Sequence, residues 1–441
     1  MEHHEKKVNL CVNPSLFFKS VLSIYRGLSV LALPFLWLLA KKRLQIKKET
    51  ACRIKQRFGI TNHQRPSGNV VWIHAASLGE ARMALSIAQK ILQDHKDFYV
   101  LVTTQTLGAC TYIQGVPRLI HQMAPFDSIV YVKRFFRHWH PSCAFILEAE
   151  RWPNLLYEAF KRKIPLIGVN THISEKSLDR WTICSRFFSE LLSLFSICFT
   201  SSIQTQKRLL QASFGKMSIY LAPSLKYASS FDDMSIPENL KNFSQAWHQK
   251  NIFFEGRSYW LASCIHACEM PLILQVHEML RKKSPNLLLI LIPRHPHQFI
   301  DFPNASVYWS KQKKISKDTP IYVIDIFGET QRFYQHALFC VLGGSFNPIG
   351  GHNLIEPISK GCAVIHGPYV HNCPELYAPF IKQCASCVAR DIHSLTEHIQ
   401  NFLIQPHCAK DQAKLAYALY LENLKELNQY LIHLSYLATC S

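Results

Sequence analysis

The chain has 441 residues, of which 48% are hydrophobic and 18% charged, and its formal net charge at pH 7 is +19. This length fits two domains better than one, and the composition excludes a disordered chain. The excess of lysine and arginine indicates a polyanionic partner. Nucleic acid, an anionic membrane and a phosphorylated substrate all satisfy that requirement.

The 15 cysteines are scattered through the chain. Cys384 and Cys387 form one close pair and Cys264 and Cys268 another, but no second pair follows at the spacing of a zinc site. We therefore expect reduced, mostly buried thiols in a cytosolic compartment, with no metal and no other cofactor.

Residues 21–40 are largely apolar and have about the length of one bilayer crossing. Arg26 and Pro34 interrupt the stretch. Five basic residues follow it, namely Lys41, Lys42, Arg43, Lys47 and Lys48. Their position predicts that the rest of the chain stays on the cytoplasmic side of a membrane. Residues 1–48 are thus expected to be an N-terminal anchor, either a membrane span or a helix in the interface, with a buried core helix as the alternative.

Beyond this segment, apolar runs of strand length alternate with helical patterns. Strands are predicted at residues 69–75, 99–104, 144–147, 165–169 and 218–221, with a helix at 80–92. After a polar segment at 229–250, strands are predicted at 260–265, 286–292, 321–324, 337–342 and 363–365, followed by closing helices at 412–437. This alternation is typical of parallel sheets with helices on both faces.

The fold expected is α/β, with two Rossmann-like, doubly wound domains at residues 49–228 and 251–441. The polar segment at 229–250 is expected to link them. Two such domains in series are typical of GT-B glycosyltransferases, whose active site is the cleft between the domains. In parallel sheets ligands bind at the carboxyl ends of the strands.

The segment 342–357, LGGSFNPIGGHNLIEP, places two glycine pairs and two polar residues after a strand: Gly343, Gly344, Gly350, Gly351, His352 and Asn353. A helix beginning near His352 would offer free N–H groups to a phosphate. Glu356, one turn into that helix, could accept the hydroxyls of a ribose. The alternative is a tight structural turn, but two glycine pairs between a strand and an acidic helix favour a phosphate site.

The segment 72–80, WIHAASLGE, also runs from a strand through small residues to a helix, and it contains Ser77, Gly79 and Glu80. A carboxylate at this position can take the proton of an attacking hydroxyl group. The helix N-terminus would keep Glu80 ionised while lowering its basicity. Alternatively, Glu80 only complements the helix dipole.

Arg294, His295 and Pro296 directly follow a strongly apolar strand. The planar guanidinium of Arg294 suits a phosphate or a carboxylate, with a solvated surface arginine as the alternative.

Glu148 and Glu150 follow another predicted strand. Paired carboxylates can do acid/base work, but these two would repel each other unless a positive group lies between them. Lys226 ends the first predicted domain and either faces the cleft or lies on the surface.

Taken in order, these segments resemble the Kdo (3-deoxy-D-manno-octulosonic acid) transferases of lipopolysaccharide biosynthesis, a GT-B family that acts on the lipid A precursor lipid IVA. The resemblance rests on residues 72–80, Glu148, Glu150, Trp152, Pro153, Asn154, Asn170, Ser174, Lys176, Ser177, Lys226, Tyr227, His266, Glu269, 293–296 and 343–357. It covers nearly the whole chain, and the last motif is the most specific.

The resemblance implies an inverting, metal-independent transfer of one or more Kdo residues from CMP-Kdo to lipid IVA. The first domain would bind the acceptor and the second the donor, at the cytoplasmic face of an anionic bacterial inner membrane, with no nucleic acid as partner. Glu80 would be the general base, Arg294 and the loop at 350–353 would lie near the phosphate, and Glu356 on the ribose. His295 and Pro296 would also bind the donor. Further cleft candidates are Ser77, Gly79, Glu148, Glu150, Lys226, His266, Glu269, Gly343 and Gly344.

The chain departs from the family pattern at His172, Cys268, Cys264-Ile265 and Pro223-Ser224, which bears on the contacts around His172 and His266. The residues are compatible with two alternatives. One is a GT-B enzyme that uses another nucleotide sugar. The other is a basic, membrane-tethered scaffold or nucleic-acid binder, which would gather basic and aromatic residues on one face.

Overall fold

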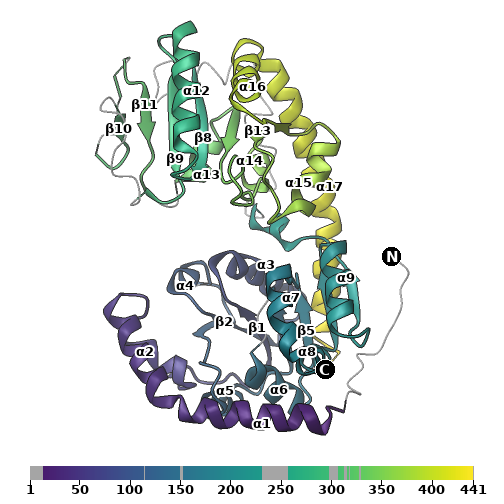
Figure 1. Ribbon diagram of the computed structural model, residues 1–441. Helices are drawn as coiled ribbons and strands as arrows, with labels where there is room; N and C mark the ends of the chain where they lie inside the picture. Colours follow the sequence, from purple (N-terminus) through teal and green to yellow (C-terminus); the bar gives the residue numbers. More distant parts are fainter. Residues whose placement is uncertain are drawn as a thin grey trace. The chain divides into compact units, whose positions relative to one another are not determined.

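The computed structural model describes residues 13–113, 115–148, 152–230, 257–296, 306–311, 315–316, 318–326 and 329–440. The chain divides into two compact units, Met1–Ser229 with Glu426–Ser441, and Ser230–Lys425 (Figure 1). The expected linker at 229–250 lies outside the described residues apart from its first two. Each unit contains one parallel sheet of seven strands, as the doubly wound fold requires.

The first sheet has the strand order β3-β2-β1-β4-β5-β6-β7. Its strands are β1 (Asn69–Ala75), β2 (Phe98–Thr104), β3 (Leu119–Met123), β4 (Cys143–Leu147), β5 (Leu166–Val169), β6 (Ile197–Thr200) and β7 (Ile219–Leu221). The chain reverses its winding direction at β1, which pairs with both β2 and β4. The loops after β1 and β4 therefore flank the position where such sheets bind ligands.

Helices connect these strands and cover both faces of the sheet. They are α3 (Leu78–Asp94), α4 (Cys110–Ile113), α5 (Ile129–Trp139), α6 (Pro153–Lys161), α7 (Glu175–Trp181), α8 (Ser185–Leu192) and α9 (Ile203–Ala212), with 3-10 turns η1 (Ile54–Phe58), η2 (Leu107–Ala109), η3 (Thr182–Cys184) and η4 (Leu225–Ser230).

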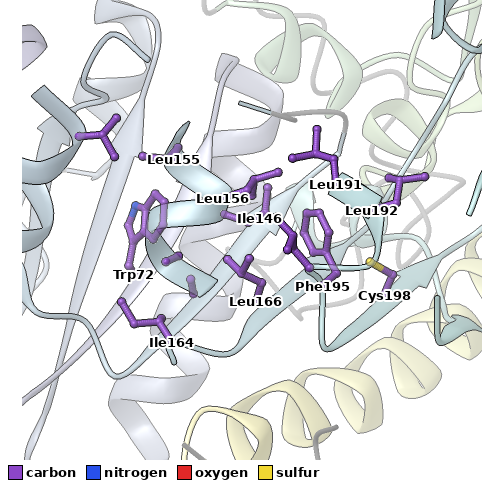
Figure 2. Close-up of a cluster of buried hydrophobic side chains, with 14 of the residues drawn as sticks. Trp72, Ile146, Leu155, Leu156, Ile164, Leu166, Leu191, Leu192, Phe195 and Cys198 are labelled. Atoms are coloured by element: carbon purple, nitrogen blue, oxygen red, sulfur yellow. The ribbon is translucent and has the colours of Figure 1, made fainter. Parts of the chain in front are cut away.

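The core of the first unit follows the strand alternation. Trp72, on one side of β1, packs with Phe135 and Phe136 of α5, and the cluster continues through Leu155, Leu166 and Leu191 (Figure 2). The alternate residue Ile73 points to the opposite face. Both residues are fully buried, which fixes the direction in which the loop after β1 leaves the sheet.

The apolar N-terminal segment forms two helices, α1 (Leu16–Leu31) and α2 (Leu33–Gln45), bent by 56°. Within the described part of the chain no single helix is long and apolar enough to cross a membrane, whereas this pair together has the length and composition. Pro34 near the start of α2 accounts for the break, since proline lacks the backbone N–H that a continuous helix would use and is favoured in a first turn. We call α1 and α2 together the N-terminal helix pair.

One side of α1 docks on the first unit. Phe18 is fully buried and stacks on Phe187 of α8, with ring centroids 4.9 Å apart. Arg26 pairs with Glu158 of α6 at 2.6 Å. These contacts join α1 to the helices on one face of the first sheet.

The second sheet has the order β10-β11-β9-β8-β12-β13-β14. Its strands are β8 (Tyr259–Ile265), β9 (Leu288–Pro293), β10 (Ser306–Tyr308), β11 (Ile321–Val323), β12 (Phe339–Leu342), β13 (Ala363–His366) and β14 (Cys387–Val388). Here the winding reverses at β8, which lies between β9 and β12. The loops after β8 and β12 therefore occupy the same topological position as those after β1 and β4.

The helices of the second unit are α12 (Met270–Lys283), α13 (Thr330–Tyr334), α14 (Ile355–Ser359), α15 (Pro374–Lys382), α16 (Ile392–Ile404) and the first part of α17 (Pro406–Leu437). Ala409 and Ala413 of α17 belong to the core of this unit. The last part of α17 belongs to the first unit, where Tyr430 contacts the ring of Phe199 at 5.3 Å. The sequence pattern predicts the whole of 251–441 in the second domain, whereas the last turns of α17 belong to the first unit.

Candidate active site

Glu80 lies directly beyond β1, in the first turn of α3. Ser77 is the N-cap of this helix, and its hydroxyl accepts a hydrogen bond from Glu80 N–H at 3.2 Å. The Glu80 carboxylate reaches back and accepts from Ala76 N–H at 2.8 Å. This reciprocal arrangement is close to a capping box and holds the carboxylate in one orientation. Glu80 is 6% exposed, so this capping side chain is largely buried.

Neighbouring strands of the first sheet bring further polar groups to the same edge. Glu148 follows β4 and Asn170 follows β5, and both adopt positive φ angles, 51° and 50°. Asn170 Nδ2 donates to Glu148 Oε1 at 3.4 Å, and Ser201 after β6 donates to Asn170 at 3.4 Å. Residues outside glycine rarely adopt this conformation, and such residues cluster at functional sites.

Three other residues that the sequence singles out in the first unit are Glu150, Lys226 and His172. Glu150 lies outside the described residues, so its pairing with Glu148 stays a prediction. Lys226 lies in η4, half-buried, with its N–H donated to Ser224 Oγ at 3.4 Å. His172 contacts Thr205 Oγ1 through Nδ1 at 3.4 Å.

Glu269 has a different role from the one expected of a cleft residue. It is fully buried, and its two oxygens accept hydrogen bonds from four backbone N–H groups. The donors are His266 at 3.0 Å, Gly344 at 2.8 Å, Ser345 at 3.0 Å and Phe346 at 2.9 Å. A carboxylate occupied in this way organises the loops after β8 and β12. It is a structural residue of the site.

The glycines allow the loop after β12 to fold back on itself. Gly344 has φ +70°, and a Cβ there would come within 2.6 Å of the His352 ring. Gly350 has φ +113°, and a Cβ there would overlap the Asn372 side chain. Gly351 N–H donates to Gly344 O at 2.7 Å and closes the loop. Only glycine satisfies both the backbone angle and the space at these positions.

The expected helix N-terminus at His352 is wrong. Helix α14 begins at Ile355, its N-cap is Leu354, and it has only five residues. Asn353 Oδ1 accepts from Ile355 N–H at 3.1 Å and so takes one of the free donors of this short helix. Glu356 is half-buried in the first turn of α14 instead of one turn further along. Loop groups and side chains, not a helix dipole, are therefore available to a ligand.

Three histidines gather beside the glycine loop. His266 Nε2 lies 2.9 Å from His352 Nε2, and the His295 ring packs edge-on against His266 at 5.7 Å. Burial, followed by the nearby Arg294 charge, lowers the pKa of His352 to about 4, and burial likewise lowers the pKa of His266. Both rings are therefore neutral at pH 7. One nitrogen of the close pair carries the proton and the other accepts it.

Arg294 continues directly from β9. Its N–H donates to Ile265 O at 2.9 Å, which ties the ends of β9 and β8 together, and the residue is exposed. His295 and Pro296 beside it are half-buried. The arrangement offers a charged fork and imidazole donors at the strand ends, the kind of groups that bind phosphate. Gly343 N–H donates to Ser263 O at 2.8 Å, which joins β12 to β8 at the base of the same loop.

Sequence reasoning missed two residues that hold this loop. Tyr377 of α15 donates its hydroxyl to His352 O at 2.6 Å, and Asn372 Nδ2 donates to Ile349 O at 2.8 Å. Both follow the glycine segment by about twenty residues, and no local pattern connects them with it. Among the described residues no three His, Cys, Asp or Glu side chains gather in a way that could hold a metal ion.

Comparison with known structures identifies the fold. A glycosyltransferase from Rickettsia africae matches 84% of this chain and 99% of its own, with a TM-score of 0.54 and 11% identity. A UDP-GlcNAc 2-epimerase from Neisseria meningitidis matches 81% and 99%, with a TM-score of 0.52 and 15% identity. At such low identity the likeness shows the fold alone, which is the GT-B architecture expected from the sequence.

Sequence comparison identifies the family. Residues 52–229 match the family model described as 3-deoxy-D-manno-octulosonic-acid transferase (kdotransferase). A probable mitochondrial 3-deoxy-D-manno-octulosonic acid transferase of Arabidopsis thaliana is 33% identical over 79% of this chain and 80% of its own. A 3-deoxy-D-manno-octulosonic acid transferase of Rickettsia bellii is 28% identical over 89% of this chain and 93% of its own. The chain therefore belongs to the Kdo transferases, a family of glycosyltransferase enzymes.

Proposed function

We propose that this Kdo transferase moves Kdo from CMP-Kdo to lipid IVA, with inversion at the anomeric carbon. An acceptor hydroxyl attacks that carbon, the bond to the CMP phosphate breaks, and the hydroxyl proton passes to Glu80. The observation that carries the proposal is the Glu80 carboxylate, which Ala76 N–H holds at 2.8 Å at the switch point of the first sheet. A fixed carboxylate at this position suits a general base.

The second unit supplies the groups that suit the donor. The leaving CMP carries the charge that develops in the transition state, so cationic and N–H donors near its phosphate lower the barrier. Arg294, His266 and His352 lie at the switch point of the second sheet, around a loop that Glu269 fixes. Glu356 in α14 remains the candidate for the ribose hydroxyls.

The test is a transfer assay with CMP-Kdo generated in place and lipid IVA in detergent, with products identified by mass. We expect lipid that has gained one or more Kdo masses, which also counts the sugars added. An Arg294→Gln variant should lose turnover by about tenfold or more. A matched Arg281→Gln variant, near the far end of α12, should keep it. Turnover with another nucleotide sugar but none with CMP-Kdo would overturn the donor assignment.

The N-terminal helix pair supports a second part of the proposal, namely attachment to the surface of an anionic membrane. Its outer side exposes a row of large apolar residues: Ile24, Leu28, Leu31, Phe35, Trp37, Leu38 and Leu39. The basic residues Lys41, Lys42, Lys47 and Lys48 are exposed next to them. Apolar and basic side chains side by side favour a helix pair lying in the membrane interface.

A membrane crossing would require α1 to leave the first unit. That movement would break the Arg26–Glu158 pair, and also the bond from Tyr25 to Asp127 at 2.9 Å. We therefore favour an N-terminal helix pair that lies in the membrane interface and does not cross the membrane. Co-sedimentation with anionic vesicles should fall strongly in a Leu31→Glu, Phe35→Glu variant, while alkaline carbonate should extract the parent protein. Resistance to carbonate would instead indicate a span.

A further inference from the structure

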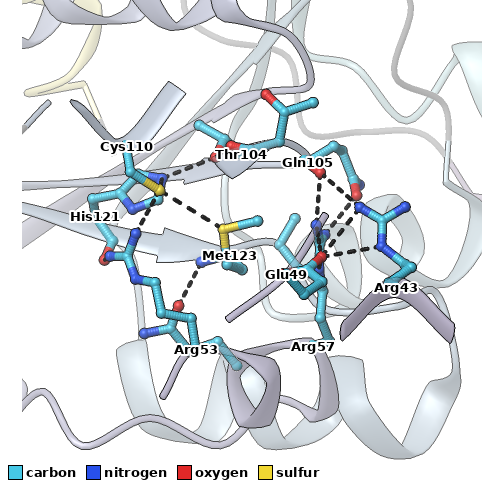
Figure 3. Close-up of polar contacts among 12 residues, drawn as sticks. Arg43, Glu49, Arg53, Arg57, Thr104, Gln105, Cys110, His121 and Met123 are labelled. Carbon is cyan, nitrogen blue, oxygen red and sulfur yellow. Dashed lines mark hydrogen bonds and ion pairs between the residues drawn. The ribbon is translucent and has the colours of Figure 1, made fainter. Parts of the chain in front are cut away.

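A buried ion-pair network joins the end of the N-terminal helix pair to the strand ends of the first sheet (Figure 3). Glu49 Oε1 accepts from Arg43 at the end of α2, at 3.2 Å from Nε, and from Arg57 Nε in η1 at 2.8 Å. The Glu49 and Arg57 side chains are 0% exposed, and that of Arg43 is 26% exposed. The neighbouring Lys41 and Lys42 are exposed, so Arg43 differs from them in turning inward.

Both arginines converge on Gln105, the residue after β2. The Gln105 carbonyl accepts from Arg57 Nη2 at 2.7 Å and from Arg43 Nη2 at 3.3 Å. Arg57 Nη1 also donates to Gln105 Oε1 at 2.7 Å and to Ala124 O at 3.0 Å. Hydrogen bonds from a charged donor are stronger than those from a neutral donor. The position of Gln105 is therefore set by the N-terminal helix pair and η1 together.

Gln105 is also the neighbour of the loop that holds Glu80. Gln105 N–H donates to Ala76 O at 3.3 Å. On the other side of the same residue, Ala76 N–H donates to Glu80 Oε2 at 2.8 Å. One continuous series of hydrogen bonds thus runs from Arg43 through Gln105 and Ala76 to the Glu80 carboxylate, and every member lies in the first unit.

We infer that Arg43, Arg57 and Gln105 are positioning residues for Glu80, so that the docking of the N-terminal helix pair on the first unit sets the position of the base. The inference rests on the proposed function, in which Glu80 takes the acceptor proton. Displacing a catalytic group by about 1 Å can lower the rate a hundredfold. Loss of the Arg43 bonds would free Gln105 on one side, and Ala76 and the Glu80 carboxylate follow it in the same series of bonds.

The experiment compares Arg43→Gln with Arg26→Gln. Both arginines belong to the N-terminal helix pair, both are partly exposed (26% and 22%), and both pair with an almost fully buried glutamate. Arg26 ties α1 to α6 and has no bond to Gln105 or Ala76 among those described. We expect kcat to fall about tenfold in Arg43→Gln with KM for both substrates within about twofold, and to recover in part in Arg43→Lys. Arg26→Gln should lose similar thermal stability but keep kcat.

A double variant separates this inference from the proposed function. If Arg43 acts through Glu80, adding Arg43→Gln to Glu80→Gln lowers kcat no further, because the two changes remove the same contribution. If the losses multiply, or if Arg43→Gln keeps the parent kcat while Glu80→Gln does not, the positioning role is overturned. Full activity of Glu80→Gln alone would overturn the base assignment itself.

Discussion

A glutamate follows the first strand of the sheet in each unit, yet the two carboxylates are used differently. Glu80 follows β1 and Glu269 follows β8, at nearly the same distance along the chain. Glu269 is fully buried and bonds four backbone N–H groups, whereas Glu80 accepts from Ala76 as part of a helix cap. Position after a strand thus indicates a site residue without saying whether the residue does chemistry. At Glu269 the four backbone donors show that the carboxylate organises two loops.

The largest expected effect is on turnover in Glu80→Gln. The amide cannot take a proton, so kcat should fall by about 10²–10⁴-fold, while the unfolding midpoint stays near that of the parent. Kinetics with CMP-Kdo and lipid IVA, together with urea unfolding, measure both quantities. A variant with parent kcat would move the base elsewhere, and Glu148 is the next residue to test.

Glu269→Gln should show the opposite profile, with stability affected first. An amide has one acceptor oxygen and brings N–H donors toward backbone N–H groups, so buried donors lose their partner. We expect the free energy of unfolding to fall by about 3 kcal/mol. The control is Glu278→Gln, whose pair with Lys282 is exposed and should contribute less than about 0.5 kcal/mol. Equal stability of both variants would contradict the structural role.

The glycine loop gives a smaller and more local effect. Gly350→Ala combines a φ of +113° with an overlap on Asn372, and should cost about 2 kcal/mol and weaken CMP binding. Gly108→Ala is the matched control, since nothing lies within 4 Å of a Cβ there and no left-handed φ is involved. Isothermal titration with CMP would measure binding. Unchanged affinity in Gly350→Ala would separate this loop from the donor.

The smallest effect on stability at neutral pH comes from three buried histidines, and it grows as the pH falls. Burial lowers the pKa of His277, His352 and His366 in the second unit to about 4. The unfolded chain binds protons near pH 6.5 that these folded sites refuse, so stability falls as pH drops from about 6.5 toward 4. In the first unit Asp127 has the opposite sign, because burial raises its pKa to about 6. It favours folding as pH falls from about 6 to 4.

His277→Gln tests this pH dependence. Glutamine can replace the bonds to Trp260 and Pro320 without titrating. The loss of stability between pH 7.5 and pH 5 should shrink by up to about 2 kcal/mol. Urea unfolding at both pH values measures this difference, and an unchanged difference would show that His277 does not contribute.

Much of the fold follows from the sequence, because apolar runs such as β1 and β8 mark buried parallel strands within a residue or two. β3, β6, β10 and β14 were missed. β3 carries the polar residues His121 and Gln122, and β10 and β14 have only three and two residues. The glycine loop was recognised, but its helix begins three residues later than expected. The role of Glu269 was not predictable, because three of its donors lie 75–77 residues away.

Helix α17 has a consequence for the biosynthesis of the protein. It starts in the core of the second unit, with Ala409 and Ala413, and ends in the first, with Tyr430 against Phe199. The first unit is therefore discontinuous in the chain. Residues 426–441 belong to the first unit but are synthesised after the second, so the first unit can complete its packing only after the entire second unit has been synthesised.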